Sequence, residues 1–129
     1  VIFAGRVASE DLVELYRGAA AYVFPSRPAG GQQHEGIGMA VLEAAACGCT
    51  IIASTVTSAG DFVEDGQTGF LFDPMEDGAL TRLLHSVVCC DERARTTGLQ
   101  AAERVRQRFK WENTAAVFKD ALRMLVPRA

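Results

Sequence analysis

Two glutamates, Glu35 and Glu43, lie eight positions apart on either side of a glycine-rich junction, HEGIGMAVLE. Gly36 and Gly38 carry no Cβ, so the backbone there can approach a bound molecule closely. The apolar run that begins near Met39 is typical of a helix, whose first N–H groups and positive macrodipole end suit a phosphate. Carboxylates accept hydrogen bonds from hydroxyl groups. The stretch therefore predicts a site for a long molecule with hydroxyl-bearing groups on both sides of a diphosphate.

The two carboxylates stand at different depths in this stretch. Glu35 precedes the helix, whereas Glu43 lies about one and a half turns inside it. The neighbours of Glu43 are apolar, and an acid in so apolar a helix needs a partner. This favours a binding role for Glu43 over a surface charge. Glu35 would by itself be read as a solvated acid, and only its spacing from Glu43 indicates a function.

The elements that must position this stretch alternate between strands and helices. Short apolar runs predict strands at residues 1–5, 22–26, 50–54 and 69–74. Helical spacing predicts a helix capped by Ser9, a helix at 39–47 stopped by Gly48, a turn at 61–66, and helices at 80–88, 101–109 and 111–125. Strands that are apolar on both faces and alternate with helices indicate an α/β fold with a covered parallel sheet. Ligands of such sheets bind beyond the carboxyl ends of the strands, where the junction is expected.

Composition and charge restrict the classes of function. The 129 residues are 49% hydrophobic and 22% charged, which suits one globular domain. The net charge of −3 gives no general reason to bind nucleic acid or an anionic membrane. No apolar run has the length of a membrane span, and the first residues do not read as a leader, so a cytoplasmic location is expected.

The cysteines and histidines do not form a metal-binding pattern. No CxxC pair or Cys/His zinc spacing occurs, and His34-Glu35 is not an HExxH motif because Gly38 stands where the second histidine should be. The four cysteines are expected to be small buried residues in a reducing compartment. They are Cys47, Cys49, Cys89 and Cys90.

Five segments carry a family resemblance: VIFAGRV, LVELYRGAAAYVFPS, EGIGMAVLEAAACG, TIIAS and VEDGQTGFLFDP. In this order, with Glu35 and Glu43 forming an E-x7-E signature, they resemble the C-terminal, nucleotide-binding half of a GT-B glycosyltransferase of the retaining family 4. The match covers about residues 1–74, followed by a similar helical tail. The implied fold is a Rossmann-like parallel sheet flanked by helices, with a helical C-terminal tail.

The resemblance also implies roles for individual residues. Glu35 would hydrogen-bond the donor sugar, Glu43 the ribose of the nucleotide, and Arg6 and Val7 would lie near the base. The backbone of the junction would meet the sugar and the diphosphate through Gly36, Ile37, Gly38 and Met39. The family needs no metal, so no cofactor is expected and the nucleotide-diphosphate sugar is the substrate.

The resemblance is partial. The loop at 28–34 is longer than the family's usual link, Ile37 replaces a common phenylalanine, and Ser58–Phe62 lacks the family's proline. The family's Arg and Lys that neutralise the leaving diphosphate, and its N-terminal acceptor domain, are not in these residues. We therefore expect residues 1–129 to be a partial donor-binding domain, inactive alone, belonging to a retaining transferase whose acceptor is unknown. A sheet edge at 1–5 is expected to favour self-association.

Two alternatives stay open. GIGMAV half-matches the dinucleotide fingerprint G-x-G-x-x-G/A, with Asp61 near the distance of a ribose-binding acid, which would indicate an NAD-type domain. That fingerprint should directly follow a buried strand, which this stretch does not. The other alternative is a non-catalytic α/β interaction module.

Overall fold

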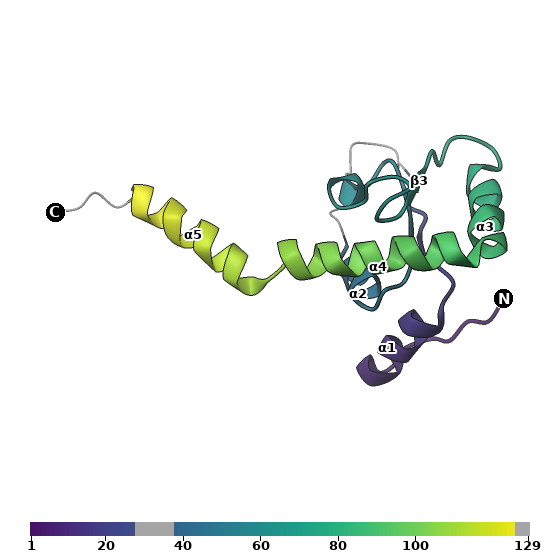
Figure 1. Ribbon diagram of the computed structural model, residues 1–129, viewed down its shortest axis with the longest axis horizontal. Coiled ribbons are helices and arrows are strands. Elements are labelled where there is room, and N and C mark those ends of the chain that lie inside the picture. The colour runs from purple at the N-terminus through teal and green to yellow at the C-terminus, as the bar shows by residue number, and fades with distance from the viewer. Residues whose placement is uncertain (28–37, 126–129) are drawn as a thin grey trace.

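The computed structural model describes residues 1–27 and 38–125 (Figure 1). The first half of the chain contains α1 (Ser9–Gly18), β1 (Tyr22–Phe24), α2 (Met39–Ala46), β2 (Ile51–Ser54) and the 3-10 helix η1 (Ser58–Asp61). The second half contains β3 (Phe70–Phe72), α3 (Ala79–Cys89), α4 (Asp91–Arg108) and α5 (Trp111–Leu125). The predicted alternation of strands and helices is therefore confirmed.

The three strands form a parallel sheet in the order β1-β2-β3. All four residues of the central strand β2 are buried. Successive side chains of a strand point to opposite faces, and Ile51 and Ala53 accordingly belong to one core while Ile52 belongs to another. The sheet is thus covered on both sides, as the sequence predicts for a Rossmann-like α/β fold.

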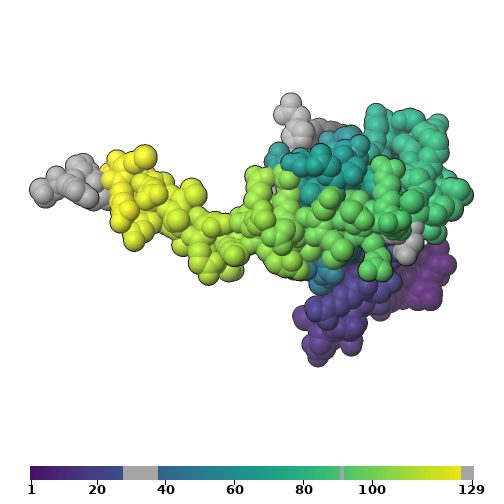
Figure 2. Space-filling view, in the orientation of Figure 1, coloured from purple at the N-terminus to yellow at the C-terminus, as the bar shows by residue number. Residues whose placement is uncertain are grey.

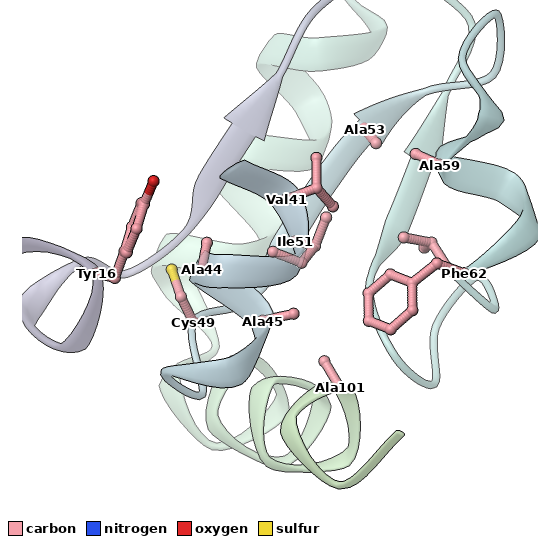
Figure 3. Close-up of a cluster of buried hydrophobic side chains, with 11 residues drawn as sticks. Tyr16, Val41, Ala44, Ala45, Cys49, Ile51, Ala53, Ala59, Phe62 and Ala101 are labelled. Atoms are coloured by element: carbon pink, nitrogen blue, oxygen red, sulfur yellow. The ribbon is translucent and has the colours of Figure 1, made fainter. Parts of the chain in front are cut away.

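The first core lies between the sheet, α1, α2 and α4 (Figure 3). The short α2 presents Val41, Ala44 and Ala45 to it, all fully buried, and Phe62 enters from the segment after η1. The ring of Phe62 packs edge-on against Phe109, with 5.6 Å between ring centroids. Small side chains on α2 allow neighbouring helices to approach it closely, which fixes the position of the helix that carries Glu43.

The second core covers the opposite face. There α3 packs its leucines against Ile52, Phe70 and Phe72, and Val87 is buried with them. Helical spacing in the sequence predicts one apolar side on this helix, made of Leu80, Leu83, Leu84, Val87 and Val88. The prediction is wrong for Val88, whose side chain is 65% exposed. At 100° per residue, Val88 turns away from the sheet when Val87 faces it.

Helix α4 crosses the turn between α2 and β2 at very close range. A Cβ placed on Gly98 would lie 2.1 Å from the carbonyl oxygen of Gly48. Beside this crossing the hydroxyl of Thr50 donates a 2.6 Å hydrogen bond to the carbonyl oxygen of Ala94. The helix predicted at 101–109 therefore begins ten residues earlier than expected, and its glycine is a packing position rather than a break.

Helix α5 extends away from the rest of the molecule (Figures 1 and 2). The side chains that the sequence places on its apolar side are exposed, and Trp111 is 84% accessible to solvent. They are Trp111, Ala115, Phe118, Leu122 and Leu125. The helix itself is confirmed, and none of its residues is buried.

Three sequence predictions are wrong in detail. Residues 1–5 form no strand, and Phe3 is 94% exposed, because an extended segment becomes a strand only by pairing and this one pairs with none of the described strands. The N-cap of α1 is Ala8 rather than Ser9. The helical turn expected at 61–66 is η1, capped by the Thr57 hydroxyl, which accepts from the N–H of Ala59.

Candidate functional site

The junction that the sequence singles out enters the described structure at Gly38. Gly38 is the N-cap of α2 and has a φ of 74°, a left-handed conformation that a Cβ would strain. A Cβ there would also lie 3.2 Å from Cζ of Phe24, the last residue of β1. A glycine is therefore needed both for the turn and for seating α2 against the carboxyl end of β1.

The first turn of α2 carries no side-chain cap. Among the described residues, no side chain accepts a hydrogen bond from its N–H groups, and no acidic residue occupies the turn. Helix N-termini leave donors unpaired and carry partial positive charge, which suits an anion. Met39, at this end, is 72% exposed. The predicted positions Gly38 and Met39 thus lie at an accessible helix N-terminus on the edge of the sheet where such folds bind ligands.

The Glu43 side chain is exposed on α2, and its carboxylate makes no hydrogen bond or ion pair with a described residue. The sequence-based argument that apolar neighbours make Glu43 need a partner does not hold, because the side chain faces outward between buried Val41 and Ala44. Burial raises the pKa of Tyr22, and the charge of Glu43 raises it further. An exposed carboxylate is free to accept hydrogen bonds from a bound molecule.

Burial raises the pKa values of two tyrosines, Tyr16 and Tyr22, and both lie near enough to Glu43 for its charge to raise them further. Tyr16 of α1 and Tyr22 of β1 pack edge-on with 5.8 Å between ring centroids. Burial raises the pKa of Tyr16, followed by the charges of Tyr22 and Glu43. Helix α1 therefore lies on the same side of the sheet as the Glu43 carboxylate, since Tyr16 and α2 share one core.

Arg6 and Val7 lie in the segment that leads into α1. Arg6 is exposed and Val7 is half-buried. Among the described residues, no hydrogen bond or ion pair joins either of them to α2. The structure brings Gly38, Met39 and Glu43 together on one helix, whereas Glu35, Gly36 and Ile37 lie outside the described residues.

The carboxyl ends of β1 and β3 border a cavity of about 250 Å³ that the sequence did not indicate. Its wall includes Arg27, which follows β1, and Asp73, which follows β3. Asp73 Oδ1 accepts a 2.8 Å hydrogen bond from the N–H of Met75. Charged residues within three positions of the ends of two parallel strands were the available signal, because such residues meet at one edge of the sheet.

Ser54, at the carboxyl end of β2, has a fully buried hydroxyl with no partner among the described residues. An unpaired buried hydroxyl costs roughly 1–3 kcal/mol. Replacing Ser54 by alanine should therefore leave the free energy of unfolding unchanged or raise it by about 1 kcal/mol, measured by urea denaturation. Thr50→Val is the control, and it should lose about 1 kcal/mol because the Thr50 hydroxyl is bonded to Ala94. Equal losses in both variants would mean that Ser54 has a partner.

The described residues hold no group of three or more His, Cys, Asp or Glu side chains arranged for a metal ion. No helix within residues 1–27 and 38–125 is both long enough and apolar enough to cross a membrane. The cysteines are free thiols, and Cys49 is buried, which raises its pKa to about 11. The expectation that all four are buried holds for Cys49, whereas Cys47 is half-buried. It is wrong for Cys89 and Cys90, which are exposed at the junction of α3 and α4.

Comparison with known proteins identifies relatives. The D-inositol 3-phosphate glycosyltransferase of Acidothermus cellulolyticus is 34% identical over 95% of this chain and 26% of its own length. A GDP-mannose-dependent alpha-(1-6)-phosphatidylinositol monomannoside mannosyltransferase of Mycobacterium tuberculosis is 30% identical over 95% of this chain and 32% of its own. The chain thus spans about a third or less of the length of these relatives.

The fold is also found in solved structures. Sucrose-phosphate synthase from Thermosynechococcus elongatus matches 97% of this chain, and 30% of its own, with a TM-score of 0.81 and 32% identity. This confirms the predicted GT-B glycosyltransferase fold. Residues 1–104 match the family described as Glycosyl transferases group 1. That match covers most of the sequence, and the chain therefore belongs to the group 1 glycosyltransferase family.

Proposed function

We propose that this chain supplies the donor site of a glycosyltransferase, in which α2 binds a nucleotide-diphosphate sugar. The observation that carries the proposal is the uncapped N-terminus of α2, which Gly38 seats against the end of β1. A diphosphate fits there because backbone N–H groups and the helix macrodipole both favour negative charge. An acidic chain with a net charge of −3 needs such a local device to hold an anion.

The two carboxylates of the E-x7-E signature take the two ends of the donor. Glu43 accepts hydrogen bonds from the ribose hydroxyls, and its exposure leaves both oxygens available. Glu35 and the backbone of Gly36 and Ile37 bind the sugar, while Gly38 and Met39 meet the diphosphate. The base lies toward the segment before α1, at Arg6 and Val7.

The whole protein transfers the sugar with retention of anomeric configuration, and residues 1–129 form part of its donor domain. Stabilising the charge that develops on the leaving diphosphate is the demand that such chemistry places on a protein. The helix N-terminus meets only part of that demand, so this chain alone binds donor without transferring sugar. No metal takes part, and the acceptor is bound elsewhere. Free thiols agree with a reducing, cytoplasmic location.

The Glu43 carboxylate should contribute measurably to donor affinity. Hydrogen bonds to a charged acceptor are worth about 1.5–3 kcal/mol, so Glu43→Gln should weaken binding roughly 10-fold or more. The measurement is a calorimetric titration of UDP-, GDP- and ADP-sugars into the chain. The glutamine keeps the size of the side chain and removes only its charge, so the fold should not change.

Glu112→Gln is the matched control, because Glu112 is also an exposed helical glutamate but lies on α5. The affinity of the Glu112→Gln variant for the donor should equal that of the unmodified chain. Equal affinity in the Glu43→Gln variant would contradict the assigned role. Binding of NAD in place of nucleotide sugars would favour the dinucleotide-binding alternative. Binding of neither would favour an interaction module.

A further inference from the structure

His85 and Cys89 lie next to each other on the exposed face of α3, one helical turn apart. The Sγ atom of Cys89 is 3.8 Å from Nδ1 and 3.7 Å from Nε2 of His85. Both side chains are exposed. Imidazole nitrogen and thiolate sulfur are the ligands that zinc prefers in proteins, so this pair has the chemistry of a metal site.

The separation of the two side chains fits a single metal ion. Zinc binds nitrogen at about 2.0–2.1 Å and sulfur at about 2.3 Å, with tetrahedral angles. Two such ligands on one ion are then about 3.6 Å apart. The observed distances of 3.7 and 3.8 Å show that the two side chains lie within the reach of one ion. Because Sγ is almost equally far from both ring nitrogens, the imidazole must rotate to direct one lone pair at that ion.

The surroundings of the pair hold it in place. Leu84 and Val87 anchor this part of α3 in the second core, which fixes the outward face that carries His85 and Cys89. Both residues lie in the last turns of the helix, which ends at Cys89.

We propose that His85 and Cys89 form a binding site for a zinc ion on the surface of α3. On binding, the Cys89 thiol loses its proton to solvent, and one Zn–S and one Zn–N bond replace two bonds from zinc to water. Water fills the other positions, since the described residues offer no third metal-binding side chain there. The site is separate from the donor site on α2 and does not depend on it. The four-ligand patterns of structural zinc sites do not include this spacing, so the sequence alone did not indicate it.

The other cysteines provide internal controls. Cys90 is also an exposed thiol, yet it lies beyond the end of α3, with a φ of −129° and a ψ of 74°, and within the described part of the chain no hydrogen bond joins it to an imidazole. Cys49 is 97% buried, at 3% exposure, and its thiol keeps its proton because burial raises its pKa to about 11. A metal ion that needed only a free thiol would therefore choose Cys90 as readily as Cys89.

Titration of the chain with Co²⁺ tests the proposal, with thiolate-to-cobalt charge-transfer absorption as the signal. We expect one ion per chain and displacement of the signal by Zn²⁺. Cys89→Ser should abolish the signal, and His85→Ala should weaken binding at least 10-fold. Cys90→Ser should leave both signal and affinity unchanged. All three positions are exposed, so these variants should retain the fold, which circular dichroism checks.

Two results would overturn the proposal. Unchanged affinity in His85→Ala would mean that a thiol alone binds the ion. A signal that survives in Cys89→Ser and disappears in Cys90→Ser would show that Cys90, and not Cys89, binds the ion. Because zinc binding releases a proton, affinity should also fall as the pH is lowered.

Discussion

Replacing Gly98 by alanine should destabilise the chain by about 3 kcal/mol, the upper part of the range for overpacked cores. The added Cβ would lie 2.1 Å from the Gly48 carbonyl oxygen and 3.0 Å from its carbon. Both are backbone atoms, so no side-chain rotation relieves the overlap. Helix α4 would have to move away from the turn between α2 and β2, stretching the bond from Thr50 to Ala94. The measurement is the free energy of unfolding in urea.

Gly18→Ala is the matched control for that variant. Gly18 is the last residue of α1, and a Cβ there would meet nothing within 4 Å. Alanine favours helices over glycine by about 1 kcal/mol, so this variant should be unchanged or slightly more stable. The two variants make the same chemical change in a helix and differ only in packing. A Gly98→Ala variant as stable as Gly18→Ala would show that α4 does not cross the turn as described.

Replacing Phe62 by alanine should cost about 3–5 kcal/mol of unfolding free energy. Its side chain is fully inaccessible to solvent and packs edge-on against Phe109. The substitution leaves a cavity between the sheet and α4 and also removes an aromatic pair. Thermal unfolding should show a correspondingly lower midpoint.

Phe118→Ala provides the comparison for Phe62. It removes the same atoms from a side chain that is 66% exposed on α5. Its cost should be below about 0.5 kcal/mol, as for surface substitutions in general. If both variants lost the same stability, Phe118 would be buried in solution and α5 would not extend as it does here.

The central part of the fold could be predicted because its residues carry strong local signals. Residues 51–53 are apolar and β-branched at two positions, which is typical of a strand inside a covered sheet, and Gly48 marks the end of α2 with a φ of 81°. The apolar spacing of α3 and α5 defines both helices. Such signals depend on neighbours in the sequence, and so they can be read from it.

Other features depend on contacts between distant segments, which sequence patterns do not contain. Residues 1–5 have the composition of a strand, yet they pair with none of the described strands. From the sequence alone Gly98 indicates a helix break, because the backbone of Gly48 that packs against it is fifty positions away. At the site, the sequence identifies Gly38, Met39 and Glu43 as neighbours along α2. It does not reveal that Glu43 is exposed, because a short apolar helix has the same composition on every face.

The proposed binding of a nucleotide sugar at the start of α2 is tested most directly by mapping backbone amide shifts in 15N-labelled protein. A nucleotide-diphosphate sugar is titrated while the amide resonances are followed. We expect the largest shifts at Gly38 and Met39, whose N–H groups are proposed to bind the diphosphate, with smaller ones near Glu43. The amides of α5 should not move. Shifts elsewhere without any at Gly38 and Met39, or no shifts at millimolar donor, would contradict the account.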